Sequence, residues 1–449
     1  MKAIILAAGE GKRMNSKLPK VLHEVLGKSM ISHVISTAKK AGAEQCIVVV
    51  GHKAEKVKEK TENMYEDLFF VEQKEQKGTG HAVMMAKDFL EEETEVLILY
   101  GDVPLIKEET LIELSSYHKE AGNSVTVVST YVEDPTGYGR IIRTENSIAI
   151  VEHRDATQQQ REINEINTGI YIFKAKALRD AISELKNDNS QEEYYLTDTL
   201  EIISRKGERV SSKVFEDSDE FLGVNNREQL SDVSYKMKHR INKKHMENGV
   251  TIIDSNTTYI SPEVTIGMDS IIFPNTMLEG HTSIGENCMV GPNCKITNTE
   301  IKDNVKFEYS VCTDSKIGNN TAVGPFAYLR PNSVVGENCK IGDFVEVKNS
   351  EIGNNTKVSH LTYIGDSDVG NNINVGCGTV TVNYDGKRKD RTVIEDDAFI
   401  GCNANLIAPV TVKKGAFVAA GSTVTMDVPE NSLAVARVRQ SNKLNWNMK

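Results

Sequence analysis

The sequence predicts an α/β domain with a mostly parallel sheet, followed by a domain of stacked parallel β-coils. Up to about residue 228, apolar runs of strand length alternate with helical patterns, as in sheets that are covered by helices. After residue 250, aliphatic residues recur at a period of six, which fits no α-helix. The 449 residues are enough for two large domains or about three average ones.

The composition narrows the classes of function. The net charge of −11 gives no global positive field that would recruit nucleic acid. No apolar run approaches the roughly 20 residues that a bilayer span needs, and the first residues lack the layout of a signal peptide. Seven cysteines without CxxC spacing argue against a disulfide framework and against a zinc site. We therefore expect a cytoplasmic protein without nucleic-acid or membrane partners.

The first half is predicted to be one domain, residues 1–228. Its runs QCIVVVG (45–51), EVLILYGD (95–102) and SVTVVSTYV (124–132) are rich in β-branched residues and suit strands that are buried on both faces. Between such strands lie helical patterns, for example residues 21–42, which a glycine closes.

A long helix is predicted over residues 226–249, and residues 229–250 are assigned as a helical linker. Apolar residues recur there at helical spacing: Leu230, Val233, Met237 and Ile241. Asn248 and Gly249 form a plausible stop. The other face is rich in Lys and Arg, which favours a solvated connecting helix.

The second half, residues 251–449, is predicted to be a β-solenoid with a C-terminal tail. The period-six aliphatic residues include Ile266, Ile272, Leu278, Ile284, Val290, Ile296, Ile317, Val323, Leu329, Val335, Ile341, Val347, Ile394, Ile400, Leu406, Val412, Val418 and Val424. The position two before each of them is nearly always small, which lets the chain turn a corner. Three sides of six residues close a triangular coil, so residues 251–436 give roughly ten coils. Cys288, Cys294 and Cys339 are then small corner residues rather than redox or metal groups.

The period breaks at NYDGKRKDR, residues 383–391. A solenoid accommodates an insertion only as an outward loop. Because this loop is polar and cationic, we consider it a candidate binding element.

The chain opens with MKAIILAAGEGKRMNSKLPK, in which a short strand runs into glycines, Arg13 and Lys20. Parallel sheets bind ligands at such strand ends, and glycines let backbone N–H groups approach phosphate oxygens. The stretch matches neither a dinucleotide fingerprint nor a Walker loop. A phosphate-binding loop and a plain surface turn both remain open.

Three further stretches carry polar or glycine-rich turns after predicted strands. Asp102 follows the strand in YGDVPL and is either a Mg²⁺ ligand or a cap of the following turn. QKGTGHA (76–82) and TGYGR (136–140) are glycine turns that could approach a nucleotide or a sugar.

A set of motifs in fixed order resembles the sugar-1-phosphate nucleotidyltransferases: LAAGEGKRM, LPK, GTGHA, YGDVPL, GYGR, IVEHRDA, EINTGIY, EYYLTD and GVNNR. The second half adds HLTYIGD, GCGT, NYDG and AVARVRQ. Together they resemble, along essentially the whole chain, the bifunctional GlmU family. That resemblance implies a Rossmann-like uridylyltransferase domain joined to a left-handed β-helix with acetyltransferase activity. The expected reactions are acetyl transfer from acetyl-CoA to glucosamine-1-phosphate and uridylyl transfer from UTP to N-acetylglucosamine-1-phosphate, which supply cell-wall peptidoglycan precursors.

The resemblance also implies the residues of the first site. The triphosphate would be bound by Leu6, Ala7, Ala8, Gly9, Arg13 and Lys20, the last two being catalytic. The uracil and ribose would contact Gln73, Gly78 and Thr79. The sugar would contact Gly139, Glu152 and Asn167, and Mg²⁺ would be held by Asp102 and Asn225, the latter also at the nucleotide. Lys12 departs from the threonine that is usual in the family.

For the second site, the resemblance implies His360 as the general base on the amino group. Glucosamine-1-phosphate would contact Arg330, Lys348, Tyr363 and Asn374. Acetyl-CoA would contact Cys377, Asn383, Tyr384, Cys402, Ala420 and Arg437. Cys377 stands where the family often has alanine. The resemblance further implies a homotrimer formed through the β-helix, and a prism with flat faces suits such a closed assembly.

Two other interpretations stay open at this point. The chain could be a nucleotidyltransferase whose β-helix serves only in oligomerisation or regulation. It could also be a solenoid scaffold without catalysis, although that interpretation leaves Asp102, Asn225 and the cationic glycine loop unexplained.

Overall fold

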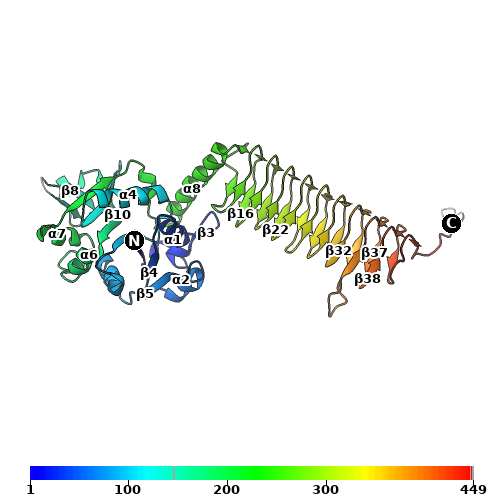
Figure 1. The fold of residues 1–449 in the computed structure, drawn as a ribbon, viewed down its shortest axis with the longest axis horizontal. Coiled ribbons are helices and arrows are strands. Elements are labelled where there is room, and N and C mark those ends of the chain that lie inside the picture. The colour runs from blue at the N-terminus through cyan, green and yellow to red at the C-terminus, as the bar shows by residue number, and fades with distance from the viewer. Residues whose placement is uncertain (145–146, 445, 447–449) are drawn as a thin grey trace. The chain divides into compact units, whose positions relative to one another are not determined.

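The computed structural model describes residues 1–144, 147–444 and 446. The chain packs as two compact units, Met1–Met237 and Lys238–Lys449. The first unit contains layers of helices and strands, and the second contains stacked coils (Figure 1). Both agree with the prediction from the sequence. Among the described residues, no helix has both the length and the apolar character needed to cross a bilayer.

A twisted sheet forms the centre of the first unit, in the strand order β11-β7-β10-β6-β1-β4-β5. The strands are β1 (Lys2–Ala7), β4 (Gln45–Val50), β5 (Leu68–Glu72), β6 (Glu95–Tyr100), β7 (Val125–Tyr131), β10 (Glu165–Lys174) and β11 (Val210–Val214). Of these, β10 runs antiparallel to β6 and β7, and the other pairs are parallel. The hairpin β8 (Arg140–Arg143) and β9 (Ile148–Val151) joins β10, and β2 (Glu24–Val25) pairs with β3 (Lys28–Ser29).

Helices cover both faces of this sheet. They are α1 (Met30–Lys40), α2 (Ala54–Thr61), α3 (Thr79–Met85), α4 (Glu108–Glu120), α5 (Gln158–Arg161), α6 (Ala175–Ile182) and α7 (Asp198–Arg205), with 3-10 turns η1 (Lys12–Met14), η2 (Lys20–Leu22), η3 (Lys87–Phe89) and η4 (Ser218–Phe221). Along β1, Ile4 and Leu6 belong to one apolar core and Ala3, Ile5 and Ala7 to the other. This is why the strands are continuously apolar rather than alternating.

The helix expected over residues 21–42 is wrong in its first part. Residues before Met30 form η2 and the β2–β3 hairpin, and the helix begins only at Met30. Leu26 and Gly27 have positive φ, so they form the tight turn of the hairpin. Ser29 then caps the helix by accepting a hydrogen bond from Ser32 N.

Helix α8 (Arg227–Glu247) confirms the long helix that was expected. Asn226 caps it through a bond from Gln229 N to its Oδ1, and Gly249 ends it at a φ of 87°. Its basic face is not wholly solvated, because Lys238 and Asn242 are buried and donate to backbone carbonyls of residues 255–258. In this way the last turns of α8 cover the open end of the β-helix.

The second unit is a left-handed parallel β-helix of hexapeptide repeats, and its coils close through three parallel sheets. We name each sheet by its first strand. The β12 sheet contains β12 (Thr251–Ile252), β15 (Ile271–Ile272), β18 (Met289–Val290), β21 (Lys306–Phe307), β24 (Ala322–Val323), β27 (Lys340–Asp343), β30 (Lys357–His360), β33 (Asn374–Val375), β36 (Phe399–Ile400), β39 (Phe417–Val418) and β41 (Leu433–Ala434).

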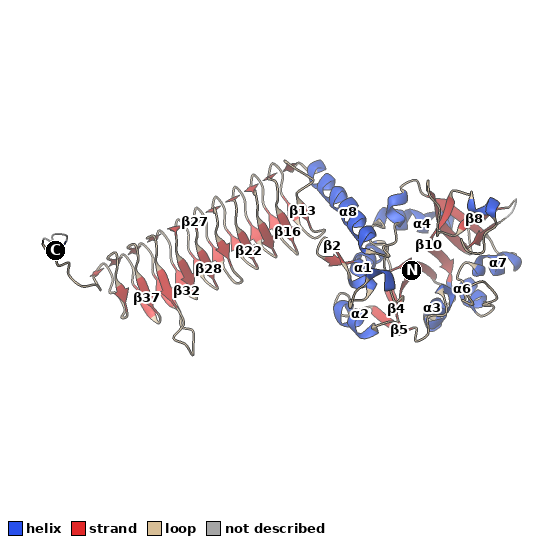
Figure 2. Ribbon diagram, turned by 180° about the vertical axis from the view of Figure 1, so that it is seen from behind, coloured by secondary structure: helices blue, strands red, loops and turns tan. Residues whose placement is uncertain are grey.

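The β13 sheet contains β13 (Tyr259–Ile260), β16 (Met277–Glu279), β19 (Lys295–Thr297), β22 (Val311–Thr313), β25 (Tyr328–Leu329), β28 (Glu346–Lys348), β31 (Tyr363–Gly365), β34 (Val380–Val382), β37 (Asn405–Ile407) and β40 (Thr423–Val424). The β14 sheet contains β14 (Thr265–Ile266), β17 (Ser283–Ile284), β20 (Glu300–Ile301), β23 (Lys316–Ile317), β26 (Val334–Val335), β29 (Glu351–Ile352), β32 (Ser367–Val369), β35 (Thr392–Ile394) and β38 (Val410–Val412). Figure 2 shows the short strands of successive coils stacked side by side.

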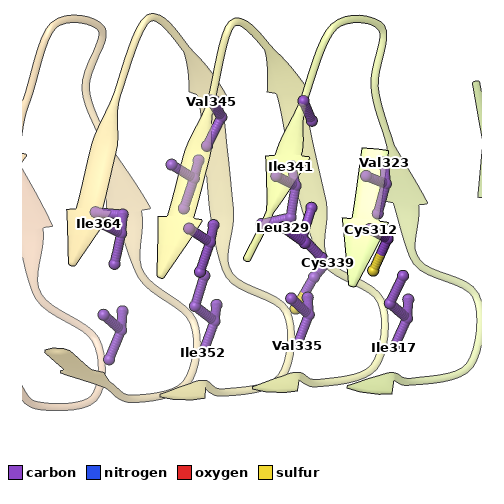
Figure 3. Close-up of a cluster of buried hydrophobic side chains, with 14 of the residues drawn as sticks. Cys312, Ile317, Val323, Leu329, Val335, Cys339, Ile341, Val345, Ile352 and Ile364 are labelled. Atoms are coloured by element: carbon purple, nitrogen blue, oxygen red, sulfur yellow. The ribbon is translucent and has the colours of Figure 1, made fainter. Parts of the chain in front are cut away.

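The aliphatic residues of the six-residue period point into the coils and form one continuous core (Figure 3). Among the partly buried members at its edge is Ile266. All seven cysteines are free, and Cys288, Cys294 and Cys339 are buried as expected of small corner residues. The loop at residues 383–391 projects outward from the stack, also as expected (Figure 1).

Residues with positive φ mark the corners of the coils. Corner 1 joins the β12 sheet to the β13 sheet, and its residues with positive φ are Asn275, Gly291, Asn293, Tyr309, Gly324, Phe326, Phe344, Leu361, Gly378, Asn403 and Gly421. Corner 2 joins the β13 sheet to the β14 sheet, and its residues with positive φ are Gly280, Asn298, Asp314, Asn332, Asn349, Asp366 and, within the outward loop, Gly386. Gly and Asn adopt this conformation at least cost, whereas a bulky residue there needs a reason.

His118 of α4 is a buried ionisable group whose environment predicts a pH effect on the first unit. Its Nδ1 lies 2.9 Å from Thr126 Oγ1, and burial, with Lys174 and Lys119 nearby, lowers its pKa to about 4. The neutral ring is therefore favoured in the folded state. Its contribution is complete above the unfolded pKa of about 6.5 and is lost as the pH falls toward 4, by up to about 3 kcal/mol.

We therefore predict that the first unit loses stability between pH 7 and pH 4.5, and that His118→Gln removes much of this loss. The measurement is hydrogen exchange of β7 peptides, corrected for the intrinsic effect of pH, with peptides of the β-helix core as internal control. An equal loss of protection in the two proteins would show that His118 does not cause it.

Candidate active sites

Two cavities that share part of their lining open at the carboxyl ends of β1 and β6. Their volumes are about 360 Å³ and about 450 Å³. Both are lined by Thr79, Tyr100, Asp102, Glu193 and Asn225. The parallel pairing of β1 with β4 and β6 brings the loops after these strands to one edge, which is where open α/β sheets bind ligands.

Every residue predicted for the first site lines one of these cavities. The smaller cavity is lined by Leu6, Ala7, Ala8, Gly9, Lys20, Gln73, Gly78, Thr79, Asp102 and Asn225. The larger one adds Arg13, Gly139, Glu152 and Asn167. The structure brings these residues together, while their individual roles stay predictions. Lys12, the departure from the family pattern, is exposed and pairs with Glu10 at 3.0 Å.

Two glycines set the shape of the smaller cavity. Gly11 has a φ of 66°, and a Cβ there would lie 2.6 Å from Lys20 Cβ. Gly78 has a φ of 100°, and a Cβ there would lie 2.6 Å from Tyr194 O. A side chain at either position would push the loop away from the cavity, so the backbone can approach a ligand only with glycine.

The Lys20 ammonium lies between two oxygen donors. It pairs with the Asp102 carboxylate and lies 3.2 Å from Asn225 Oδ1. The side chains of Lys20 and Asp102 are each only 15% exposed. A carboxylate and an amide oxygen that converge on one cation form a donor set that suits Mg²⁺, which takes one or two protein ligands together with phosphate and water. The described residues contain no cluster of three or more His, Cys, Asp or Glu able to hold a metal, and such a site does not require one.

Arg227, two residues after Asn225 and at the start of α8, contacts the segment that carries Arg13 and Lys20. Its Nε lies 3.3 Å from Met14 O, and its guanidinium nitrogen NH1 lies 3.2 Å from His23 Nδ1. Burial, and then the Arg227 charge, lower the pKa of His23, so a neutral ring accepts this bond. Met14 follows Arg13, and His23 follows η2, which begins at Lys20. Sequence reasoning missed Arg227 although GVNNR contains it.

Glu152 and Asn167 line the larger cavity beside Gly139. Asn167 N donates to Gly139 O at 2.9 Å, and the Asn167 Nδ2 group donates to Tyr171 OH at 2.7 Å. Burial raises the pKa of Glu152, and a bond from the Thr197 hydroxyl opposes this rise. Sequence reasoning also missed Glu193, Tyr195 and Thr197, although the motif EYYLTD contains all three.

The residues predicted for the second site lie on the β-helix in two rows. His360, Cys377, Cys402 and Ala420 lie at corner 1, and Arg437 lies beside Gly421 of that corner. At corner 2, Arg330 and Asn383 directly follow strands of the β13 sheet, and Lys348 is the last residue of β28. Tyr363 faces outward from the β13 sheet, Asn374 is exposed on the β12 sheet, and Tyr384 is exposed in the outward loop.

At corner 1, His360 pairs with a carboxylate from the preceding coil. Its Nδ1 lies 2.6 Å from Asp343 Oδ1. The side chains of His360 and Asp343 are 55% and 39% exposed. The bond from His360 lowers the pKa of Asp343 below its usual range.

At corner 2, the buried Asp366 gathers three partners. Lys348 Nζ lies 3.3 Å from its Oδ2, Asn349 Nδ2 lies 2.5 Å from its Oδ1, and Asn383 Nδ2 also donates to it. Burial acts to lower the pKa of Lys348, but contacts including the Asp366 carboxylate keep it raised. Arg330 pairs with Glu346 at 2.8 Å. Both cations predicted for the sugar phosphate are therefore held in place before any ligand binds.

Within one chain, the two rows are separated by the width of the β13 sheet. His360 and Lys348 thus belong to different corners of the same prism. A groove of about 550 Å³ runs along corner 2, but its lining residues include Asn349 and Arg391 rather than the predicted acetyl-transfer residues. One chain does not assemble the second site as it assembles the first.

Comparison with known families matches both units. The model described as nucleotidyl transferase matches residues 2–235. Bacterial transferase hexapeptide (six repeats) matches residues 263–298 and 314–349, and hexapeptide repeat of succinyl-transferase matches residues 391–426.

Curated relatives match over the whole length. Bifunctional protein GlmU of Clostridioides difficile is 52% identical over 447 residues, which cover 99% of this chain and 97% of that protein. Bifunctional protein GlmU of Alkaliphilus oremlandii is 54% identical over 448 residues, covering 99% and 98%. Bifunctional protein GlmU of Acetivibrio thermocellus is 52% identical over 450 residues, covering 100% and 97%.

The contacts of Arg227 predict a positioning role at the first site. Arg227→Ala should lower the nucleotide-dependent activity expected of these cavities by about tenfold, because Asn225 and the loop of Arg13 would be held less firmly. A tenfold loss corresponds to a rise of about 1.4 kcal/mol in the activation free energy. The matched control on the same helix is Lys236→Ala, which breaks only a surface pair with Asp219. The measurement is the steady-state rate of each variant. An equal fall in both rates would contradict the prediction.

Proposed function

The chain belongs to the bifunctional GlmU family, and from that premise we propose how its residues divide two reactions between its two units. It is a bifunctional transferase of UDP-N-acetylglucosamine synthesis. The β-helix transfers the acetyl group of acetyl-CoA to glucosamine-1-phosphate. The nucleotidyltransferase unit transfers the uridylyl group of UTP to N-acetylglucosamine-1-phosphate and releases pyrophosphate. The observation that carries the residue assignment is the gathering of all predicted first-site residues around two cavities with shared lining.

In uridylyl transfer, the sugar phosphate attacks the α-phosphate of UTP in line. No covalent intermediate is needed, so catalysis depends on positioning and on neutralisation of charge. The backbone from Leu6 to Gly9 would bind the triphosphate, and Arg13 and Lys20 would neutralise it. Gln73, Gly78 and Thr79 would contact the uracil and ribose in the smaller cavity, and the larger cavity would hold the sugar.

The donor set at Asp102 and Asn225 would hold Mg²⁺ when the nucleotide is bound. The ion would supply charge neutralisation at the phosphates. Lys20 now occupies the place between these oxygens. Arg227 keeps Asn225 in reach of the loop that bears Arg13.

In acetyl transfer, the amino group of glucosamine-1-phosphate attacks the thioester carbonyl of acetyl-CoA. His360 would accept the proton as the C–N bond forms, and the coenzyme A thiolate would leave. Arg330, Lys348, Tyr363 and Asn374 would bind the sugar phosphate. Cys377, Asn383, Tyr384, Cys402, Ala420 and Arg437 would line the path of acetyl-CoA, and Cys377 is small enough to leave that path open.

The outer surface of the β-helix supports a homotrimer. At corner 1, Tyr309, Phe326, Phe344 and Leu361 stack along successive coils with exposures of 41%, 55%, 58% and 59%, all with positive φ. The ring centroid of Phe326 lies 5.7 Å from that of Tyr309 and 5.4 Å from that of Phe344. The adjoining β13 sheet presents further exposed apolar side chains: Tyr259, Met277, Val311 and Tyr328. Such a continuous apolar face suits burial against a second copy of this chain.

A trimer with the β13 sheet facing its axis would also complete the second site. The two edges of that sheet are corner 1 and corner 2. Around a three-fold axis, corner 1 of one subunit meets corner 2 of the next, which would place His360 beside the Arg330 and Lys348 row of a neighbour. The separation of the two rows within one chain is thereby explained.

The domain limits proposed are 1–228 for the uridylyltransferase, 229–250 for the linker and 251–449 for the acetyltransferase with its tail. The division of the compact units after Met237 falls inside the proposed linker and supports this scheme. We place the protein in the cytoplasm, where its substrates are made, with the seven free cysteines as the support.

The assignment predicts that the two activities separate. His360→Ala should lower acetyl transfer by at least about 100-fold and leave uridylyl transfer unchanged, and Asp102→Ala should do the reverse. The assays are coenzyme A release and pyrophosphate release, with circular dichroism to verify the fold. Loss of both activities in either folded variant would refute the assignment. Absence of acetyl transfer in the unaltered protein would instead favour a β-helix that only oligomerises or regulates.

The shared site predicts complementation between inactive subunits. His360→Ala alters corner 1 and Lys348→Ala alters corner 2, so a mixed trimer of the two retains some intact sites. Acetyl transfer should recover to about a quarter of the wild-type rate at equal mixing, since a site is intact in only one of the four equally frequent pairings of neighbouring subunits. The matched control mixes Lys348→Ala with Arg330→Ala, both at corner 2, and should recover nothing. Mixtures that exchange subunits without recovery, or a monomeric mass in solution, would contradict the shared site.

A further inference from the structure

The pair formed by Asp343 and His360 is built into the backbone of two neighbouring coils. Most strands of the β12 sheet contain two residues, whereas β27 and β30 contain four. The added pairing places Asp343 opposite His360. A Cβ on Gly342 would lie 2.0 Å from Ser359 O, so this close approach requires a glycine just before Asp343. Leu361 N also donates to Asp343 O at 2.9 Å.

The bond fixes which nitrogen of His360 carries the proton. A carboxylate only accepts hydrogen bonds, so the Nδ1 group donates to Asp343 Oδ1. In the neutral ring, Nε2 then has the free lone pair. A general base needs this tautomer, with the other nitrogen held by a fixed acceptor.

We propose that Asp343 is a positioning residue for acetyl transfer, which orients His360 and stabilises the imidazolium that forms when His360 accepts the amine proton. The inference rests on the proposed role of His360. In the step concerned, the amine lone pair forms the C–N bond and the C–S bond breaks with its electrons on sulfur. Nε2 takes the proton that the nitrogen loses and can then pass it to the thiolate. Asp343 stays ionised throughout and touches neither substrate.

Other ionisable groups on the neighbouring strands do not take the place of Asp343. Lys340 of β27 and Lys357 of β30 face outward from the β12 sheet, Glu346 and Tyr363 lie beyond corner 1, and Cys377 follows in the next coil. Within the described residues, the ion pair recorded for His360 is the one with Asp343. In the proposed trimer, Arg330 and Lys348 of a neighbour would approach the same ring. These groups are equally present in an Asp343 variant, so they do not alter the comparison with the unaltered protein.

The test is the pH dependence of kcat/KM for acetyl transfer in Asp343→Asn. An opposite charge beside an imidazole favours its protonated form, so removing the carboxylate makes His360 a weaker base. Because the base must be unprotonated, the acidic limb of the profile should move to lower pH. The rate on the plateau should fall by about tenfold, since a weaker, less well-oriented base accepts the proton more slowly. Asp343→Glu should restore part of both effects, and Asp343→Ala should move the limb as far and lower the plateau further.

The matched control is Asp397→Asn. Asp397 is a carboxylate of the β-helix that, like Asp343, has a basic group nearby, here Lys414 at 4.0 Å, but it lies after β35 rather than at corner 1. This variant should keep the acetyl-transfer profile of the unaltered protein. Uridylyl transfer should be unchanged in every variant, and circular dichroism together with the mass in solution checks that the β-helix is intact.

The outcomes separate the two hypotheses. If Asp343→Asn keeps the position of the acidic limb, or lowers the rate equally at all pH values, Asp343 has at most a structural role and the inference is wrong. If His360→Ala retains acetyl transfer, the proposed base is wrong and the inference falls with it. If His360→Ala is inactive and the limb moves as described only in the Asp343 variants, both are supported.

Discussion

The parallel register of the strands is the constraint on which both units depend. In the first unit, pairing of β1 with β4 and β6 fixes which loops meet at the carboxyl edge, so Gly9, Lys20 and Asp102 reach the same space. In the β-helix, each strand pairs with its counterpart one coil away, so a row of side chains runs along each corner. Because every backbone ladder is satisfied in this register, a shift would expose the core residues of an entire coil.

In both candidate sites, the cationic side chains form ion pairs with carboxylates. Lys20 pairs with Asp102, Lys348 with Asp366 and Arg330 with Glu346. The net charge of −11 gives no long-range attraction for phosphates, so cations must act locally at each site. A carboxylate partner offsets part of the desolvation cost of each cation and holds its side chain in one place, so less conformational freedom is lost when a phosphate binds. The carboxylate partners thus order the cations of the candidate sites.

The fold was predictable from sequence because its signals are local and repeated. Ile272, Val290 and Val323 follow the period of six and are all buried. The alternation of strand and helix patterns predicted the α/β fold of the first unit. The residues of the first site could be predicted through the resemblance. Arg227 could not, because its bond to Met14 O joins positions about two hundred residues apart in the sequence. Asp343 was missed for a similar reason, because its partner lies in the next coil. Residues 21–29 were mistaken for helix because a hairpin turn can follow the same apolar spacing.

Departures from the repeat mark the chemistry of the β-helix. A regular coil needs only strands of two or three residues and Asn, Asp or Gly at its corners, and such coils form the stack without any further property. The four-residue strands β27 and β30, the bulky residues of corner 1 and the loop at residues 383–391 break that rule within a few coils of one another. Each departure adds what a repeat does not supply: a histidine held by a carboxylate, a row of exposed apolar side chains, and a cationic loop. The rest of the solenoid holds these three features in register, so the stack itself determines where the site can form.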